Sequence, residues 1–331
     1  MAVPWSPERL ERDVRRLVDR DLPPAALREE ALARVLRAVP ADGACLPSAD
    51  PASHVLLEHT TRGLPPEEAG RFHAVEYGVR DRVAHEALAG GRRRAVALAA
   101  GRAGVRGREL LEPLGFGHEL RAAVRDRWGT PAFLHLYRTR GAAPFDPGHL
   151  AAVERVLAPL AGALRTAVLR DAPVPAVAAA PVVLVVDEDG VAEATAGAPA
   201  GLPAGLPEGL AAWVRARGQA APRVLAGGDA GWFAVDAAPL GAAGRVAVVV
   251  APAPAAALAD LALQAHGLTP AERRVVGLVR RGRSTAEIAA ELHLSPWTVQ
   301  DRLQDVFAKT GVRSRRQLVA LLDGAQAAAA A

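Results

Sequence analysis

The chain has 331 residues, of which 50% are hydrophobic and 23% charged, and this size and composition predict two or three globular domains. The single cysteine, Cys45, excludes a disulfide framework and a multi-cysteine metal site, and the lack of a long apolar run predicts a cytoplasmic protein. Residues 268–331 carry 10 basic and 6 acidic side chains, against 4 and 8 in residues 173–267, so the basic C-terminal segment suits a polyanionic partner.

Residues 1–172 predict an α/β domain. Residues 8–39 have the spacing of two amphipathic helices with a break at Leu22–Pro24, because proline ends a helix and restricts the residue before it. Short apolar runs bounded by turn residues predict strands, and a longer stretch with apolar residues at helical spacing predicts a helix that closes the domain. These later elements are three strands over residues 94–100, 119–125 and 128–138, and a helix over residues 147–170.

A Pro- and Ala-rich linker over residues 173–181 precedes a smaller α/β domain over residues 182–265. Its residues 187–190 predict a hairpin turn rather than the acidic pair of a phosphoacceptor receiver, because a receiver also needs a lysine near its end and the only lysine is Lys309. The expected elements are strands near residues 182–186, 191–195, 223–225, 232–237 and 245–250, a helix over 210–217 and a helical connector over 251–266.

Helix caps predict four helices within residues 268–323. Ser295 followed by Pro296 is typical of a helix start, and Gly311 is typical of a helix end. The other three starts are capping boxes, in which a serine or threonine and the glutamate or glutamine three positions later bond to each other's backbone N–H. The pairs are Thr269 with Glu272, Ser284 with Glu287, and Ser314 with Gln317.

The second and third of these helices, residues 285–292 and 296–310, are close enough to predict a helix-turn-helix. Ile288, Ala289 and Leu292 of the second helix and Val299, Leu303 and Val306 of the third are expected to face inward. At about 100° per residue, Gln300, Asp301, Gln304 and Ala308 fall on the opposite face. Glutamine can pair with adenine, and aspartate can accept from the cytosine amino group. The pattern favours a major-groove surface; the alternative is a solvated face on a small helical adaptor.

This segment, residues 266–325, resembles the LuxR-type helix-turn-helix of bacterial transcription regulators. The resemblance implies a tetrahelical DNA-binding domain whose third helix enters the major groove and whose fourth often contributes to a dimer interface. It covers about a sixth of the chain and rests on Leu268–Val276, Gly282, Ser284–Ala289, Leu292, Leu294–Ser295, Thr298–Val299 and Lys309–Arg315.

The resemblance also implies which side chains contact DNA. The sequence departs from the family at Gln300, where a basic residue is common, and at Arg302, where histidine is common, and these departures concern base preference rather than DNA binding. The expected base contacts are Gln300, Asp301 and Gln304. The expected backbone contacts are Thr285, Ser295, Thr298, Arg302, Lys309 and Arg313.

The upstream domains resemble sensory modules. Residues 1–172 look GAF-like in their turn at Leu114–Gly117, hairpin and closing helix, and residues 182–265 look like a small PAS-like sheet with a connector. The predicted fold class is therefore multidomain: two α/β modules followed by an all-α tetrahelical helix-turn-helix domain and an Ala-rich tail over residues 326–331. This layout is similar to actinobacterial LuxR-type regulators with an N-terminal sensory half.

No catalytic residue, metal ligand or cofactor is predicted. The glycines Gly101, Gly104 and Gly107 are expected to form a flexible loop rather than a phosphate cradle, because no lysine follows them. Cys45 is expected to be a buried or incidental thiol, although a nucleophile site with His54 and His59 is the alternative. The aromatic residues of the hairpin are expected to fill its core, with a ligand pocket as the alternative. They are Trp128, Phe133 and Tyr137.

The sequence favours a non-enzymatic DNA-binding transcription regulator. Its expected partners are double-stranded DNA, a second copy of the chain, RNA polymerase, and a small-molecule or protein signal at the N-terminal half, with no membrane. The dimer is expected because Leu318, Leu321 and Leu322 cannot all face the core of one small domain. The alternative is a signalling adaptor or sigma-like factor whose C-terminal helices bind RNA polymerase or another protein.

Overall fold

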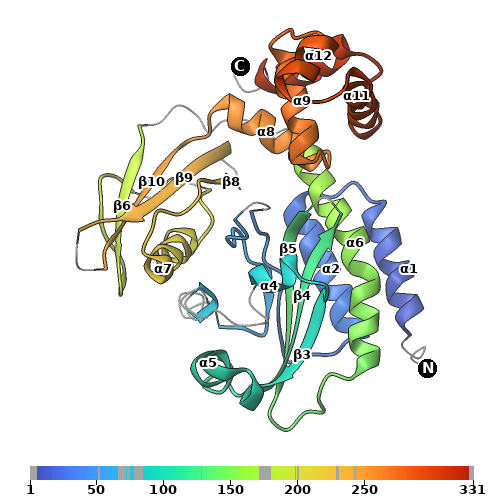
Figure 1. Ribbon diagram of the computed structural model, residues 1–331. Helices are drawn as coiled ribbons and strands as arrows, with labels where there is room; N and C mark the ends of the chain where they lie inside the picture. The colour runs from blue at the N-terminus through green and yellow to red at the C-terminus, as the bar shows by residue number, and fades with distance from the viewer. Residues whose placement is uncertain are drawn as a thin grey trace.

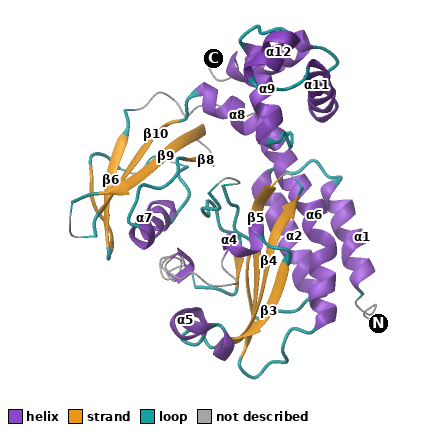
Figure 2. Cartoon of the chain, in the orientation of Figure 1, coloured by secondary structure: helices purple, strands orange, loops and turns teal. Residues whose placement is uncertain are grey.

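The computed structural model contains two five-stranded antiparallel sheets followed by a C-terminal group of helices (Figures 1 and 2). This confirms the predicted fold class of two α/β modules and an all-α domain. The residues that the structure describes are 6–50, 53–65, 72, 75–77, 85–127, 129–170, 180–197, 199, 201–228, 231–241 and 244–327. The linker at 173–179 and the end of the tail at 328–331 lie outside them.

In the first module, three helices cover one face of a sheet with strand order β2-β1-β5-β4-β3 (Figure 1). Alternation along the strands sends Leu120 and Leu134 toward the helices, where both are buried, and sends Glu119 and His135 to the other face. The helices are α1 (Pro7–Val18), α2 (Pro24–Ala38) and α6 (Pro147–Arg170). The strands are β1 (Gly43–Cys45), β2 (Thr61–Arg62), β3 (Ala95–Ala99), β4 (Phe116–Asp126) and β5 (Gly129–Thr139).

Short helical segments lie on the opposite side of this sheet. The prediction of a flexible loop at Gly101–Gly107 is wrong, because this stretch is helical and packed. A Cβ atom added at Gly107 would lie 2.0 Å from the Ala100 carbonyl oxygen, so the close approach of the two segments requires glycine. The segments are α4 (His85–Gly90), η2 (Ala100–Arg102), α5 (Gly104–Arg106) and the π-helical turn η3 (Gly107–Leu111).

The second module repeats the strand order of the first, as β7-β6-β10-β9-β8. The expected turn after the first strand is present, because Asp187 pairs with Gly190 and its side chain accepts from the Asp189 N–H at 2.9 Å. The helix begins four residues earlier than expected. The elements are β6 (Val182–Asp187), β7 (Gly190–Ala194), α7 (Leu206–Arg217), β8 (Val224–Gly228), β9 (Gly231–Pro239) and β10 (Val246–Pro252).

Two helices join the modules to one another. In α4, Glu86 forms an ion pair with Arg217 of α7, and buried apolar residues of both modules belong to one continuous cluster. The connector α8 (Ala255–Ala265) contacts α6 of the first module and the last helix of the chain. No helix in the described part of the chain combines the length and apolar character needed to cross a bilayer.

Candidate nucleic-acid interface

The C-terminal domain has four helices that start where the caps predict. Thr269 accepts from the Glu272 N–H at 3.2 Å and donates its own N–H to that carboxylate at 2.8 Å, and Ser284 and Glu287 form the same box. At Ser314 only half of the box forms. The Ser314 hydroxyl accepts from the Gln317 N–H, but the Gln317 side chain accepts from the Arg313 N–H and not from that of Ser314. The helices are α9 (Pro270–Arg280), α10 (Thr285–Glu291), α11 (Pro296–Thr310) and α12 (Arg315–Ala327).

A tight turn sets α10 against α11. His293 adopts a left-handed backbone conformation with φ of 53°, and the next N–H, from Leu294, returns to the Ala289 carbonyl at 2.9 Å. The predicted inward residues Ile288 and Ala289 are buried, and Leu292 packs against the same apolar cluster. This packing fixes the angle at which α11 leaves the domain, so the outer face of α11 is presented rigidly.

The two faces of α11 are divided as expected. Val299, Leu303 and Val306 are buried in the domain core. Gln300, Asp301 and Gln304 are exposed, and within the described residues none of these three side chains has a hydrogen-bond partner. Their donors and acceptors are therefore available to a ligand, which is the property that a base-reading surface requires.

The hydroxyl groups expected to contact DNA backbone already have structural partners. Ser295 caps α11 by accepting from the Thr298 N–H at 3.0 Å, and its oxygen lies 2.8 Å from the Thr298 hydroxyl. The Thr285 hydroxyl accepts from Arg315 at 2.7 Å, which ties the start of α12 to the start of α10. These residues lie at the N-terminal ends of the two helices, where free N–H groups favour anions.

The basic residues expected to contact the DNA backbone differ in exposure and in whether they already form an ion pair. Arg313 is exposed and Arg302 is half-buried, and no ion pair of either is found in the described part of the chain. The Lys309 ammonium instead lies 2.6 Å from a carboxylate oxygen of Glu272, with 16% of the lysine side chain exposed. Burial raises the pKa of Glu272, but hydrogen bonds from Lys309 and Thr269 outweigh it and hold the pKa below its usual value. A phosphate contact from Lys309 stays a prediction.

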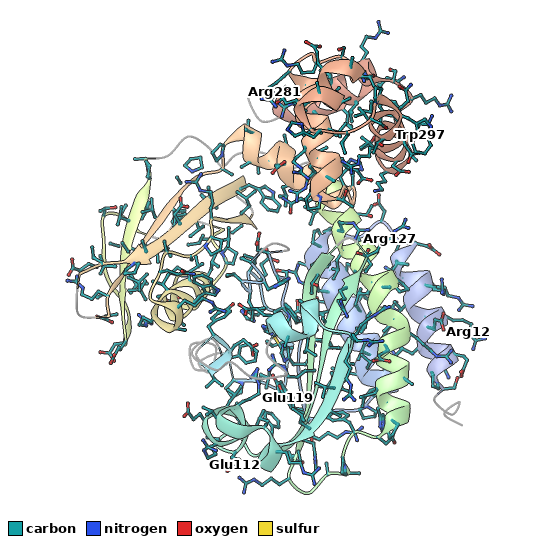
Figure 3. All side chains as sticks on the ribbon, in the orientation of Figure 1. Arg12, Glu112, Glu119, Arg127, Arg281 and Trp297 are labelled. Atoms are coloured by element: carbon teal, nitrogen blue, oxygen red, sulfur yellow. The ribbon has the colours of Figure 1, made fainter. Side chains whose placement is uncertain are left out.

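The outer face of α11 also carries an aromatic residue, Trp297, that was not among the predicted DNA contacts. Trp297 is 76% exposed at the second position of α11, on the outer edge of the domain (Figure 3). Its signal was in the spacing, because Trp297 precedes Gln300, Asp301 and Gln304 by three, four and seven positions, which places all four on one helix face.

A shallow cleft of about 430 Å³ lies beside α12. Leu321 is 38% exposed on its wall, whereas Leu318 and Leu322 are buried in the domain. The three leucines therefore divide between the core and the surface, as the sequence analysis expected. The cleft is lined by Gly311, Val312, Arg313, Gln317, Ala320 and Leu321.

A second group of ionisable residues is buried in the first module, on the sheet face away from α6. Arg121 donates to both carboxylate oxygens of Glu76 at 2.8 Å, and Arg106 pairs with the same carboxylate. The ring nitrogens of His85 and His135 lie 2.9 Å apart. Burial lowers the pKa of both histidines, that of His135 to about 4. We refer to these residues, together with the fully buried Glu119 (Figure 3), as the ionic cluster.

The structure tests two further candidates of the first module, the Cys45 thiol and the aromatic residues of the hairpin. Cys45 is buried with its Sγ 3.8 Å from the His59 Nδ1, and burial raises the thiol pKa to about 12, so it is an inert thiol rather than a nucleophile. Phe133 and Tyr137 are buried in the core, and Trp128 lies outside the described residues. No group of three metal-binding side chains is found in the part of the chain that the structure describes.

Comparison with known proteins supports the resemblance of the C-terminal domain. Residues 266–322 match the family of bacterial regulatory proteins named the luxR family. Over 52 residues the chain is 56% identical to an HTH-type transcriptional regulator of Mycobacterium tuberculosis and 48% identical to the monoamine regulon transcriptional regulator of Klebsiella aerogenes. Each match covers 16% of this chain, and the chain spans 6% and 23% of the length of these relatives.

The N-terminal half is similar to a solved GAF domain from a phosphoenolpyruvate-protein phosphotransferase of Coxiella burnetii. The similarity covers 50% of this chain and 97% of that domain, with 18% sequence identity and a TM-score of 0.38. The PAS-like interpretation of the second sheet stays a prediction.

Proposed function

We propose that the protein is a DNA-binding transcription regulator whose C-terminal domain reads the major groove through α11. The observation that carries this proposal is the exposed, unpartnered row of Gln300, Asp301 and Gln304 on a helix that its cap and core hold rigidly. The match of residues 266–322 to LuxR-family regulators supports the same role. The regulator performs no catalysis; its two sheet modules receive a small-molecule or protein signal and gate the DNA-binding domain in the cytoplasm.

The first test is salt-dependent binding of the full chain to duplex DNA. With about 4 to 6 phosphate contacts per half-site, log K is expected to fall by roughly 4 to 5 units for each tenfold increase in salt, because counterions are released on binding. Selection from random duplexes then gives the preferred site. A chain that binds no duplex, or binds with no dependence on salt, contradicts the proposal.

The second test separates base contacts from backbone contacts. Gln300→Ala or Gln304→Ala is expected to relax the selected sequence and to cost about 1 to 3 kcal/mol on the best site. Arg313→Ala is expected to weaken all duplexes alike, because phosphate contacts carry no base information. Thr285, Ser295, Thr298, Arg302 and Lys309 belong to the same proposed backbone set. An unchanged selected sequence for Gln300→Ala removes that residue from the reading surface.

We infer that two copies bind a repeated site, because one helix-turn-helix reads only a short half-site. The exposed Leu321 beside the α12 cleft is the surface that a second copy covers. Leu321→Arg is expected to abolish dimeric binding while leaving the monomer folded, since the side chain is not in the core. Analytical ultracentrifugation with a two-half-site duplex checks this, and dimeric binding by the variant at unchanged affinity contradicts it.

The adaptor or sigma-like alternative makes a different prediction. If the C-terminal helices bind RNA polymerase rather than DNA, the chain is expected to be retained by immobilised polymerase without DNA, and Gln300→Ala leaves that retention unchanged. The open hydrogen-bonding groups on α11 favour DNA, because glutamine and aspartate side chains without partners can pair with the edges of bases.

A further inference from the structure

Trp297 is unusual among the apolar side chains of the described residues. It is 76% exposed, whereas Val191, Leu240 and Leu321, the other exposed large apolar residues, reach only 38–45%. A tryptophan carries a large apolar surface, so leaving it in water forgoes much of the stability that its burial would give. The fold itself gives no reason for an aromatic residue at this position.

The backbone holds Trp297 in a fixed place. Ser295 caps α11 through the Thr298 N–H, and Pro296 occupies the first position of the helix, so Trp297 sits in a rigid first turn. The N-terminal end of a recognition helix is the part that approaches base edges in a helix-turn-helix complex. Trp297 is therefore a preorganised group that requires little further ordering on binding.

Its neighbours favour the base edges over the DNA backbone. Asp301 lies one turn further along the same face, and its carboxylate repels phosphate but can accept from a cytosine amino group. The Trp297 ring beside the Asp301 carboxylate is therefore better placed against base edges on the floor of the major groove than against phosphates. The only apolar group that the standard base pairs display there is the C5 methyl of thymine.

We propose that Trp297 contacts the C5 methyl group of a thymine next to the bases bound by Gln300 and Asp301. The inference rests on the proposed function, because it names what one further residue of the α11 face recognises. It makes Trp297 a specificity-determining residue that selects thymine by shape, alongside side chains that select by hydrogen bonds.

The experiment uses the full chain and the duplex obtained by selection. Each thymine of a half-site is replaced in turn by deoxyuridine, which removes only the methyl group. Wild type is expected to lose about 4-fold in affinity at one position, which corresponds to one buried methyl group. Trp297→Ala is expected to lose affinity for the thymine duplex by at least that factor and to show no further loss at the same deoxyuridine.

Matched variants separate the possible outcomes. Trp297→Phe keeps an aromatic ring and is expected to retain part of the thymine preference, and Val191→Ala, an exposed change in the second module, is expected to bind as wild type does. If Trp297→Ala weakens every duplex equally and still loses as much affinity at the deoxyuridine as wild type does, the inference is overturned in favour of a backbone contact. Unchanged DNA binding by Trp297→Ala overturns it in favour of a protein contact. A wild-type chain that binds no duplex overturns the proposed function as well.

Discussion

The two sheets share one strand order, but only the first buries charged side chains on one of its faces. Beneath the first sheet lies the ionic cluster, in which Glu76 and Arg121 are almost fully buried and hydrogen-bonded. The second sheet buries residues such as Leu184 and Val248, and no charged side chain is buried in its described part. Strand order therefore follows from backbone pairing and connection lengths, whereas the chemistry of the interior is a separate property that each module acquires on its own.

The largest effect is expected from breaking the ionic cluster. Arg121→Leu removes the guanidinium that binds both oxygens of Glu76 and leaves that carboxylate buried with less compensation. Loss of one partner of a buried ion pair costs about 3 to 5 kcal/mol of unfolding free energy. Urea denaturation of the full chain measures it, with exposed Arg140→Leu as control. A loss below about 1 kcal/mol shows that the ionic cluster contributes little to the stability of the first module and contradicts this prediction.

A cavity in the second sheet is expected to cost somewhat less. Leu184→Ala removes a side chain that is 1% exposed, and such truncations cost about 2 to 5 kcal/mol depending on how far the surroundings collapse. The neighbouring Val185→Ala acts on the other face of the same strand, where the residue is only half-buried, and is expected to cost less. If the two variants lose the same unfolding free energy, the second sheet does not bury its apolar core on one face alone.

The two modules are expected to differ in their response to acid. An unfolded histidine binds a proton near pH 6.5, whereas half-buried His59 and fully buried His135 do so only near pH 4. The stability that these groups contribute is complete only well above pH 6.5 and is lost as the pH falls toward 4, by about 0.7 kcal/mol per histidine between pH 7 and 6. Residues 182–265 contain no histidine. As the pH is lowered, the rate of amide hydrogen exchange, corrected for intrinsic rates, is expected to rise in β4 and β5 before it rises in β9 and β10. An equal rise in both pairs of strands at the same pH contradicts this.

The smallest effect is expected at an ion pair on the surface of the second sheet. Arg223 binds Asp236 through two nitrogen atoms, as close as 2.8 Å, but both side chains are about half exposed. Exposed pairs of this kind contribute about 0.2 to 1 kcal/mol. Arg223→Ala is therefore expected to shift the urea midpoint slightly, and a loss as large as that of Arg121→Leu removes burial as the explanation of the difference.

Local signals in the sequence predicted most elements, and long-range contacts escaped them. The cap of Thr269 and the turn after Asp187 depend on residues within three positions, so their patterns are visible in the sequence. The Lys309–Glu272 pair joins residues 37 positions apart, and a lysine in a basic C-terminal segment looks like a phosphate ligand until the fold brings the carboxylate to it. Arg121 and Glu76 are 45 positions apart, and charged residues in a hydropathy pattern indicate surface rather than interior.

The glycines and the tryptophan were misjudged or missed for a related reason. Gly107 predicted flexibility, but its lack of a side chain serves a close contact with Ala100 that only the packed structure reveals. Trp297 was missed because a tryptophan is by its residue type typical of a core, and its exposure depends on the absence of any element packed over the start of α11 among the described residues.

Lys309 has a practical consequence, because it is the only lysine in the chain. A lysine-specific protease has a single cleavage site, after residue 309 near the end of α11, and can reach it only when this helix opens locally. Where opening and closing are fast, the cleavage rate reports the free energy of that opening. The rate at which the 22-residue peptide 310–331 is released therefore measures the local opening of one helix in the 331-residue chain. DNA that covers or stiffens α11 is expected to lower this rate.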